Sequence, residues 1–224
     1  NLSIALVAMA SKRAARSRAW TARQEKDPYV REARARAYRS RAVFKLEQLD
    51  KKDSLFRRGM VVVDLGAAPG SWSQYAVQKV GPEGFVVALD RLDFAAIPGV
   101  FQIKGDFTGA DIRQKLDDAL GARQPDLVIS DLAPNLSGVH SVDQAAMEDL
   151  VLAAGRFAWS CLRPKGAFVA KLFEGSHAMG LRNEINSLFR SCQIRKPPAS
   201  RSHSAEIYLV TRGPIRQTIT PLAP

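Results

Sequence analysis

The sequence has few cysteines and few histidines. Two Cys, at positions 161 and 192, and three His are spread over 224 residues. This spacing supplies neither a disulfide framework nor a set of metal ligands, so we expect a reduced, cytoplasmic protein without a bound metal. The longest apolar run, residues 1–10, is too short to span a bilayer and lacks the preceding positive charges of a signal peptide. We therefore expect no membrane segment, and we regard residues 1–8 as an extension before a candidate start at Met9.

Acidic residues are scarce at both ends of the chain. The net charge is +11, but residues 1–58 carry +10, residues 59–155 carry −7 and residues 156–224 carry +8. Basic ends that flank an acidic middle are typical of a protein that holds a polyanion against a nucleotide-like cofactor. The alternative is a solvated basic tail that serves only solubility.

Aromatic residues are also few in the basic N-terminal segment, which contains only Trp20, Tyr29 and Tyr38. Such a segment buries little surface by itself. We therefore expect residues 1–38 to form a basic extension that is disordered at first and helical near the core. The next segment, SRAVFKLEQLDKK, predicts a helix with its N-cap at Ser40 and its end near Gly59.

From Met60 onward, short apolar runs alternate with helical patterns. The seven runs are MVVVDLG, FVVALD, VFQIKGD, DLVISD, AFVAKLF, CQIRK and EIYLVTR. This alternation predicts an α/β fold in which a mostly parallel sheet has helices on both faces. The link between the last two runs, PPASRSHSA, is too short for a crossover helix, so one strand near an edge should run antiparallel. The long helix after His140 should begin with a capping box of Ser141 and Gln144 and end before Pro164.

The first strand leads into a glycine turn, VVVDLGAAPGSWSQY. A dinucleotide site would have the pattern G-x-G-x-x-G, and an NAD-dependent oxidoreductase is the rival interpretation. The loop from Gly66 to Gly70 lacks the second Gly that lets backbone approach a pyrophosphate. Asp64 before this loop suits a cofactor without phosphates, whose amino-acid end carries an ammonium and a carboxylate. S-adenosyl-L-methionine fits that description.

Four Asp residues lie at the carboxyl ends of four successive predicted strands: Asp64, Asp90, Asp106 and Asp131. Asp90 follows Gly66 by 24 residues, close to the spacing at which an acidic residue reaches ribose hydroxyls. Asp106 is placed to accept a hydrogen bond from an adenine amino group. One such Asp alone is as often a helix N-cap, but four together favour a cofactor crevice.

Two ionisable residues lie in strands that are otherwise predicted to be buried. Lys171 is inside AFVAKLF, and Glu206 opens EIYLVTR. A Lys in a core strand is unfavourable unless it is paired or functional. Lys45 lies between Phe44 and Leu46 on its helix, where a snorkelling surface lysine is the simpler interpretation.

Six segments, in chain order, closely resemble motifs of the FtsJ (RrmJ, RlmE) family of heat-shock RNA methyltransferases: RSRAVFKL, VVVDLGAAPGSWSQY, GDF, SDLAPNLSG, VAKLFEG and RSHSAEIYLV. The resemblance extends from Asp27 to Arg212. It implies a Rossmann-like methyltransferase domain over residues 39–213 and a C-terminal tail over 214–224. It also implies methyl transfer to the 2′-hydroxyl of a uridine ribose in large-subunit ribosomal RNA. The alternatives are ribose methylation of tRNA or of an mRNA cap, and a catalytically silent RNA-binding protein of the same fold.

The resemblance also assigns functional residues. Its Lys-Asp-Lys-Glu catalytic tetrad falls on Lys45, Asp131, Lys171 and Glu206. Its S-adenosyl-L-methionine contacts fall on Gly70, Trp72, Asp90, Asp106 and Asp131. It implies no metal site, and we expect a monomer. Ser71 departs from the family, which usually has a second Gly before the Trp.

Two basic clusters flank the predicted catalytic residues in the sequence. One comprises Arg31, Arg34, Arg36, Arg39 and Arg41, and the other comprises Arg195, Lys196 and Arg201. We expect both clusters to contact phosphates on either side of the target nucleotide, which would position RNA without reading its sequence. RNA binding should then weaken steeply with salt. The three aromatic residues of the extension either stack on bases or pack the arm onto the domain.

Overall fold

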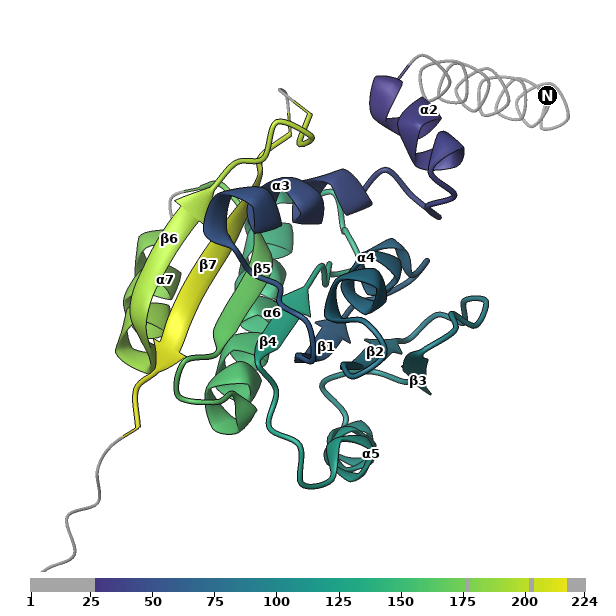
Figure 1. The fold of residues 1–224 in the computed structure, drawn as a ribbon. Helices are drawn as coiled ribbons and strands as arrows, with labels where there is room; N and C mark the ends of the chain where they lie inside the picture. Colours follow the sequence, from purple (N-terminus) through teal and green to yellow (C-terminus); the bar gives the residue numbers. More distant parts are fainter. Residues whose placement is uncertain (1–26, 176–177, 202–203, 217–224) are drawn as a thin grey trace, which may run out of the picture.

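Seven strands form one sheet at the centre of the computed structural model, which describes residues 27–175, 178–201 and 204–216 (Figure 1). The strands are β1 (Val61–Leu65), β2 (Phe85–Asp90), β3 (Val100–Lys104), β4 (Leu127–Ser130), β5 (Ala167–Phe173), β6 (Phe189–Arg195) and β7 (Glu206–Pro214). Their order across the sheet is β3-β2-β1-β4-β5-β7-β6. Neighbouring strands pair in parallel except at β7, which is antiparallel to both β5 and β6. The predicted sheet, with one reversed strand near its edge, is confirmed.

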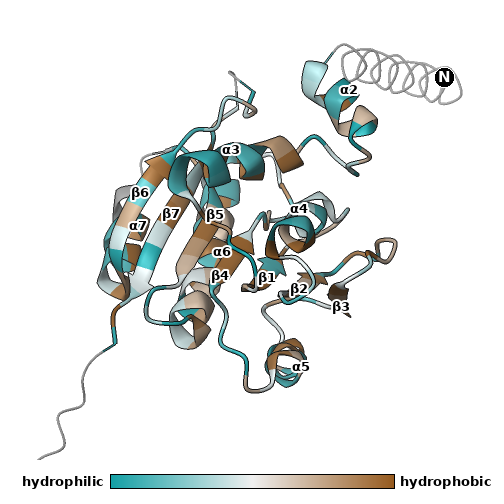
Figure 2. Ribbon diagram, viewed as in Figure 1, coloured by the Kyte–Doolittle hydropathy of each residue, from teal (hydrophilic) through white to brown (hydrophobic). Residues whose placement is uncertain are grey.

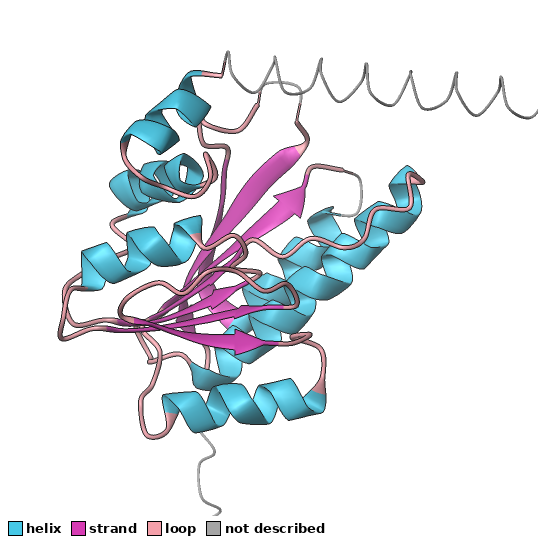
Figure 3. Cartoon of the chain, turned by 90° about the vertical axis from the view of Figure 1, so that its right-hand side faces the viewer, coloured by secondary structure: helices cyan, strands magenta, loops and turns pink. Residues whose placement is uncertain are grey.

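Helices cover both faces of the sheet, as the alternating pattern predicts (Figure 3). The helices are α2 (Pro28–Ala35), α3 (Val43–Asp53), α4 (Ser71–Val80), α5 (Ala110–Leu120), α6 (His140–Cys161) and α7 (Ala178–Leu188). α3 and α4 pack on one face, whereas α5, α6 and α7 pack on the other. The predicted end of α6 before Pro164 is confirmed.

The central strands are hydrophobic and have apolar cores on both sides (Figure 2). All five residues of β1 are buried, as expected for a parallel strand covered on both faces. Alternate residues such as Val62, Ile129 and Val169 pack toward α3 and α4. Because side chains alternate along a strand, Lys171 points to this same face, beside α3.

The start of α3 differs from the prediction. The helix begins at Val43, and its N-cap position is Ala42, which makes no side-chain cap. The Ser40 hydroxyl accepts a hydrogen bond from the backbone N–H of Ala42 at 3.2 Å and bonds to the hydroxyl of Ser71 at 2.8 Å. Ser40 therefore joins the arm to the start of α4 instead of capping α3.

The end of α3 also comes earlier than predicted. The helix stops at Asp53, because Ser54 adopts a left-handed conformation with φ of 50°. The Asp50 carboxylate then accepts the backbone N–H groups of Leu55 and Phe56 at 2.9 and 3.0 Å. A side chain inside the helix thus stabilises the turn that ends it.

The predicted capping box of α6 is wrong. The helix begins at His140, so Ser141 lies inside its first turn, and no side chain caps the N-terminus. Asp143, also in the first turn, takes a related role: its carboxylate accepts the backbone N–H and the hydroxyl of Ser137, both at 2.7 Å. The polar residues of this turn therefore stabilise the preceding loop.

The boundaries of the domain stay a prediction. β7 continues to Pro214, and α2 lies before residue 39. Residues 1–26, which include Met9, Trp20 and most of the predicted extension, lie outside the described residues, as do residues 217–224. In the described ranges, no helix is long and apolar enough to cross a membrane.

Candidate active site

A cavity of about 950 Å³ lies at the carboxyl ends of β1, β2, β3 and β4. Asp90, Asp106 and Asp131 line it, together with Gly66. Open α/β sheets bind ligands in a crevice at this position, beyond the ends of the parallel strands. Among the described residues, no group of His, Cys, Asp and Glu side chains is placed to hold a metal ion.

Gly66 lets two loops approach each other at the floor of the cavity. Its φ is +77°, and a Cβ atom there would lie 2.8 Å from the backbone nitrogen of Leu132 and 3.1 Å from the carbonyl carbon of Asp131. Any larger residue would push the turn after β1 away from the loop after β4. The glycine therefore keeps the turn after β1 in close contact with the loop that carries Asp131.

Asp90 organises the rim of the cavity after β2. One carboxylate oxygen accepts the backbone N–H of Ala68 at 2.9 Å, and the other accepts that of Leu92 at 2.8 Å. A carboxylate has about four lone-pair sites, so both oxygens can still accept hydroxyl groups from a ligand. Asp90 thus combines a fixed position with free acceptor capacity.

Asp106 provides a second acidic acceptor on the rim. Its Oδ1 accepts the Thr108 hydroxyl at 2.7 Å and the Thr108 backbone N–H at 2.9 Å. These bonds, helped by Arg91 at 3.5 Å, lower the pKa of the Asp106 carboxyl. Its side chain is half exposed, so an ionised acceptor faces the space in which a ligand would lie.

Gly70 and Trp72, two of the predicted cofactor contacts, do not line this cavity. The Trp72 side chain is buried, and its indole N–H donates to the carbonyl oxygen of Ala42 at 2.8 Å. Its ring centroid lies 5.9 Å from that of Tyr208. The indole therefore belongs to the core beneath α3. That Gly70 and Trp72 contact the cofactor stays a prediction. Such a contact would have to come from backbone atoms, because Gly70 has no side chain and that of Trp72 is buried.

Lys171 and Asp131 form an ion pair across adjacent strands. Lys171 Nζ lies 2.9 Å from Asp131 Oδ1 and donates a hydrogen bond to the carbonyl oxygen of the same residue at 2.7 Å. The lysine side chain is 10% exposed and the aspartate side chain 23% exposed. The ion pair thus gives Lys171, a lysine in a buried strand, a partner, and that partner lines the cavity.

Lys45 and Glu206 form a second ion pair on the same face of the sheet. Their charged atoms lie 2.6 Å apart, and each side chain is only 15% exposed, so the snorkelling interpretation of Lys45 is wrong. Burial raises the pKa of Glu206, but Lys45, Tyr208 and Lys171 outweigh it and lower this pKa below its ordinary value. The structure therefore brings the four predicted tetrad residues together; their catalytic roles stay a prediction.

Tyr208 is a member of this cluster that the sequence analysis missed. It pairs with Lys171 across β5 and β7, and its hydroxyl donates to Glu206 at 2.8 Å. Burial raises its pKa well above the ordinary value, and the carboxylates of Asp131 and Glu206 add to that effect. The available signal was its position two residues after Glu206, which places both side chains on one face of the strand.

Asp64, the first of the four strand-end Asp residues, lies inside β1 and does not line the cavity. It is fully buried, Ser73 donates to its Oδ2 at 2.6 Å, and its Oδ1 has no hydrogen-bond partner among the described residues. Burial, with smaller contributions from Asp131 and Asp90, raises the pKa of this carboxyl to about 7 despite the Ser73 hydrogen bond.

An Asp64→Asn variant should gain stability over the wild type as the pH rises. The folded chain keeps a proton on Asp64 up to about pH 7, whereas the unfolded chain releases it near pH 3.8. The contribution of this group to the free energy of unfolding therefore falls as the pH rises from about 3.8 to about 7. Asn resembles the protonated form and avoids this loss. Its advantage should be larger at about pH 8 than at about pH 5 by on the order of 2 kcal/mol, or several degrees in Tm. Thermal unfolding at both pH values measures the difference, and an advantage that is the same at both would contradict it.

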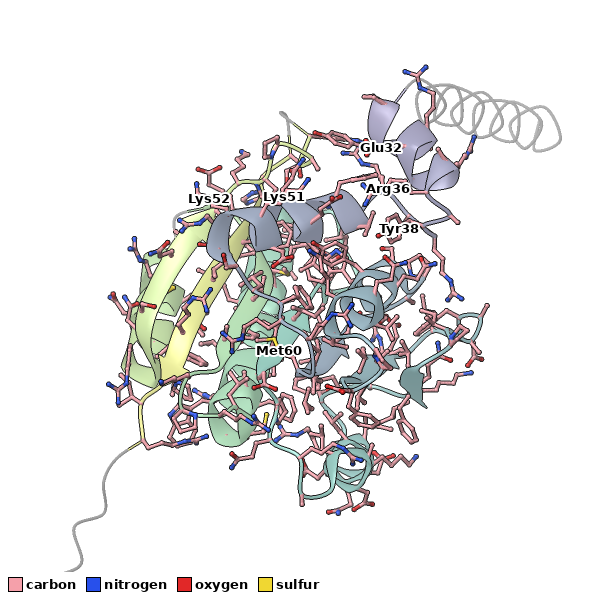
Figure 4. The ribbon with its side chains drawn as sticks, viewed as in Figure 1. Glu32, Arg36, Tyr38, Lys51, Lys52 and Met60 are labelled. Atoms are coloured by element: carbon pink, nitrogen blue, oxygen red, sulfur yellow. The ribbon has the colours of Figure 1, made fainter. Side chains whose placement is uncertain are left out.

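Part of the first predicted RNA-binding cluster makes internal contacts. Arg36 pairs with Glu47 at 2.9 Å and Glu32 at 3.2 Å, and its guanidinium lies 5.1 Å from the ring centroid of Tyr38 (Figure 4). Arg41 pairs with Asp27 and donates to a backbone carbonyl of the loop between β6 and β7. These arginines hold α2 and the following turn against the domain.

Arg31 and Arg34 are exposed, and neither forms an ion pair within the described part of the chain. In the second cluster, Arg195 pairs with Asp53 at 2.7 Å. Lys196 and Arg201 also have acidic neighbours, Glu174 at 3.5 Å and Asp27 at 3.9 Å, but both basic side chains remain more than 40% exposed. Tyr29 and Tyr38 pack against Phe44, so these aromatic residues join the arm to the domain. RNA contacts of the clusters stay a prediction, for which Arg31, Arg34, Lys196 and Arg201 are the accessible candidates.

Comparison with known proteins places this geometry in a family. Residues 38–214 match the FtsJ-like methyltransferase family. A protein of Azoarcus sp. named ribosomal RNA large subunit methyltransferase E is 49% identical over 199 residues, which cover 89% of this chain and 97% of that protein. A protein of Thiobacillus denitrificans with the same name is 46% identical over 210 residues, covering 94% of this chain and 96% of its own.

Solved structures share the fold. A Plasmodium falciparum protein described as a ribosomal RNA methyltransferase matches with a TM-score of 0.71 and 27% identity, over 79% of this chain and 98% of that one. Fibrillarin from Aeropyrum pernix, crystallised with natively bound S-adenosyl-L-methionine, matches with a TM-score of 0.54 and 15% identity, over 78% of this chain and 75% of its own. At that identity the second likeness shows only the fold. The predicted Rossmann-like fold and the family resemblance are confirmed: the chain belongs to the FtsJ-like methyltransferase family.

Proposed function

We propose that this protein transfers a methyl group from S-adenosyl-L-methionine to the 2′-hydroxyl of a uridine ribose in large-subunit ribosomal RNA. Membership of the family supports methyl transfer, and the names of relatives that are 46–49% identical support the substrate class. The observation that carries the proposal is the Lys171–Asp131 ion pair of 2.9 Å, because Asp131 also lines the cavity. The amine of Lys171 is thereby held at the edge of the proposed cofactor site.

The volume of the cavity and the chemistry of its rim support S-adenosyl-L-methionine as its ligand. Gly66 and Asp131 line the cavity side by side, because the glycine lets the turn after β1 touch the loop after β4. Asp90 would accept ribose hydroxyls through its free lone pairs, and Asp106 would accept the adenine amino group. When bound, S-adenosyl-L-methionine supplies a methyl group that is already activated by its sulfonium. The protein therefore has to position the acceptor oxygen and help it lose its proton.

The tetrad residues can divide these tasks. Lys171 would contact the ribose 2′-hydroxyl, either as the base that takes its proton or as a donor that steers its lone pair. Asp131 fixes Nζ of Lys171 through its carboxylate and its carbonyl oxygen. Glu206, held by Lys45 at 2.6 Å and by Tyr208 at 2.8 Å, adds a negative charge that orients the amine. Lys45 keeps that carboxylate ionised and in place.

The partner proposed for this site is RNA of the large ribosomal subunit. Large subunits from cells that lack this gene should accept labelled methyl groups from S-adenosyl-L-methionine when the purified protein is added. Mapping of alkali-resistant positions should then locate the new methyl on the ribose of a uridine. RNA binding measured at low and moderate salt should weaken steeply, because phosphate contacts dominate it.

Other outcomes would overturn the proposal in different ways. Transfer to tRNA or capped RNA, with none to large subunits, would replace the substrate. Binding of RNA without transfer to any of these substrates would indicate a catalytically silent RNA-binding protein. A methyl group on a base instead of a ribose would contradict the role given to Lys171.

A further inference from the structure

Arg39 of the first basic cluster donates hydrogen bonds to two loops next to the cavity. Its Nη1 donates to the carbonyl oxygens of Pro69 at 3.0 Å and Ala95 at 2.6 Å, and its Nη2 donates to that of Ala96 at 2.9 Å. The guanidinium also lies 5.9 Å from the ring centroid of Phe94. A planar fork with several N–H donors suits three carbonyl oxygens on two loops.

The two loops that Arg39 joins both supply walls of the cavity. Pro69 belongs to the turn after β1, in which Gly66 lines the cavity. Residues 95–96 belong to the loop after β2, whose first residues, Arg91 and Leu92, line the cavity next to Asp90. The Asp90 carboxylate, which is proposed to accept the ribose hydroxyls, bonds to the backbone of both loops at Ala68 and Leu92. Arg39 therefore bonds to the same two loops, at Pro69 in the first and at residues 95–96 in the second.

Gly70, at the end of the turn after β1, lies in close contact with Arg39 and with Ile97 of the loop after β2. Its φ is +103°, and a Cβ atom there would lie 2.7 Å from Ile97 Cδ1 and 2.9 Å from Arg39 Nη1. The positive φ favours glycine at this position, and any side chain there would also have to displace the ends of the Arg39 and Ile97 side chains. Three segments of the chain, around residues 39, 70 and 97, form one contact.

The arm around Arg39 is also tied to α4, which starts directly after the turn. The backbone N–H of Arg39 donates to Gln74 Oε1 at 2.9 Å, and Gln74 Nε2 donates to the carbonyl oxygen of Ala37 at 3.1 Å. The Tyr38 hydroxyl donates to Gln78 Oε1 at 2.9 Å. The guanidinium therefore extends from a backbone that is itself fixed.

We propose that Arg39 is a positioning residue for S-adenosyl-L-methionine, which holds the turn 66–70 and the loop 91–97 at the spacing that the cofactor requires. The inference rests on the proposed function. It assigns a residue of the basic arm, which the sequence analysis placed at the RNA, to the cofactor side of the site. The arm thereby serves both substrates, with Arg31 and Arg34 facing solvent and Arg39 facing the loops.

An Arg39→Lys variant separates this role from an RNA contact, because it keeps the charge and loses the fork. Its Kd for S-adenosyl-L-methionine, measured by calorimetry, should rise about tenfold or more, since several hydrogen bonds between the loops are weakened. RNA affinity in a filter-binding assay should stay near the wild-type value. At saturating cofactor, kcat should stay within about threefold of wild type, so that the loss appears in KM for the cofactor.

The matched control is Arg34→Lys, at an exposed arginine of α2, which should leave the cofactor Kd unchanged. Faster hydrogen exchange in residues 66–70 and 91–97 of Arg39→Lys would support the same role independently. Where the lysine variant folds poorly, Arg39→Gln provides a second test with the same expected pattern.

Two results would overturn the inference. One is an Arg39→Lys protein with wild-type cofactor affinity. The other is an Arg39→Met protein that loses RNA affinity but not cofactor affinity, and in which lysine restores RNA binding, as expected of a phosphate contact. A wild-type protein that does not bind S-adenosyl-L-methionine would instead overturn the proposed function, so the two failures are distinguishable.

Discussion

A Lys171→Met variant is expected to lose on the order of 10³-fold in kcat for methyl transfer, while its Kd for S-adenosyl-L-methionine stays near the wild-type value. Methionine fills the space of the buried lysine stem but offers neither a base nor a hydrogen-bond donor. Cofactor binding should survive, because the proposed contacts of Asp90 and Asp106 do not involve Lys171. Single-turnover transfer from labelled cofactor and calorimetry measure the two quantities, and thermal unfolding checks that the variant is folded.

Asp90→Ala is the matched variant with the opposite pattern. It removes the carboxylate that accepts two backbone N–H groups on the cavity rim, so cofactor affinity should fall before the chemical step is affected. Equal losses of affinity and of transfer in Lys171→Met would show that the lysine is structural. Lys171→Arg then separates its two proposed roles. An arginine still donates hydrogen bonds but stays protonated, so retained transfer would favour steering over proton removal.

Much of the fold was predictable because local patterns agree with the final topology. The apolar runs from Met60 onward are continuous enough to indicate strands buried on both faces, and the helical patterns between them require parallel connections. The reversed direction of β7 follows from the short link before it. These are properties of neighbouring residues, which a single sequence contains.

Helix ends were less predictable, because the capping residues have competing partners. Ser40 bonds to Ser71, which is distant in sequence and adjacent only in the fold. Asp50 caps the turn after α3 from inside the helix, a role that its position in a helical pattern does not indicate. Polar side chains near helix ends choose among several backbone groups, and tertiary contacts decide the choice.

The site was predictable in residue type but not in pairing. Strand-end positions indicated that four Asp residues would face one cavity; Asp90, Asp106 and Asp131 do, whereas Asp64 lies buried inside β1. They gave no means to find that Lys45 would meet Glu206, because the two approach each other only when α3 packs over β7. Which arginines are available to RNA is harder still to predict, because the number of charges in the sequence is the same whether Arg41 binds a phosphate or pairs with Asp27.

Asp131→Asn is the second variant with a large expected effect, on the order of 10²-fold in kcat at saturating cofactor. Asn keeps the size of the side chain, and the backbone carbonyl at this position can still accept the Lys171 bond of 2.7 Å. It removes the negative charge that lies 2.9 Å from Nζ. Because Asp131 also lines the cavity, the cofactor Kd should rise as well, and the comparison has to be made under saturation.

The decisive measurement is a double-mutant cycle, because residues that act as a unit lose activity non-additively. Lys171→Met combined with Asp131→Asn should be no slower than Lys171→Met alone, which corresponds to a coupling energy of about 2 kcal/mol or more. The same cycle with Glu206→Gln should give a smaller coupling, below about 1 kcal/mol, because Lys171 lowers the pKa of Glu206 through its charge and has no hydrogen bond to it among the described contacts. Additive losses for Lys171 and Asp131 would mean that the carboxylate acts on the cofactor alone, and the amine would then need another residue to hold it at the ribose oxygen.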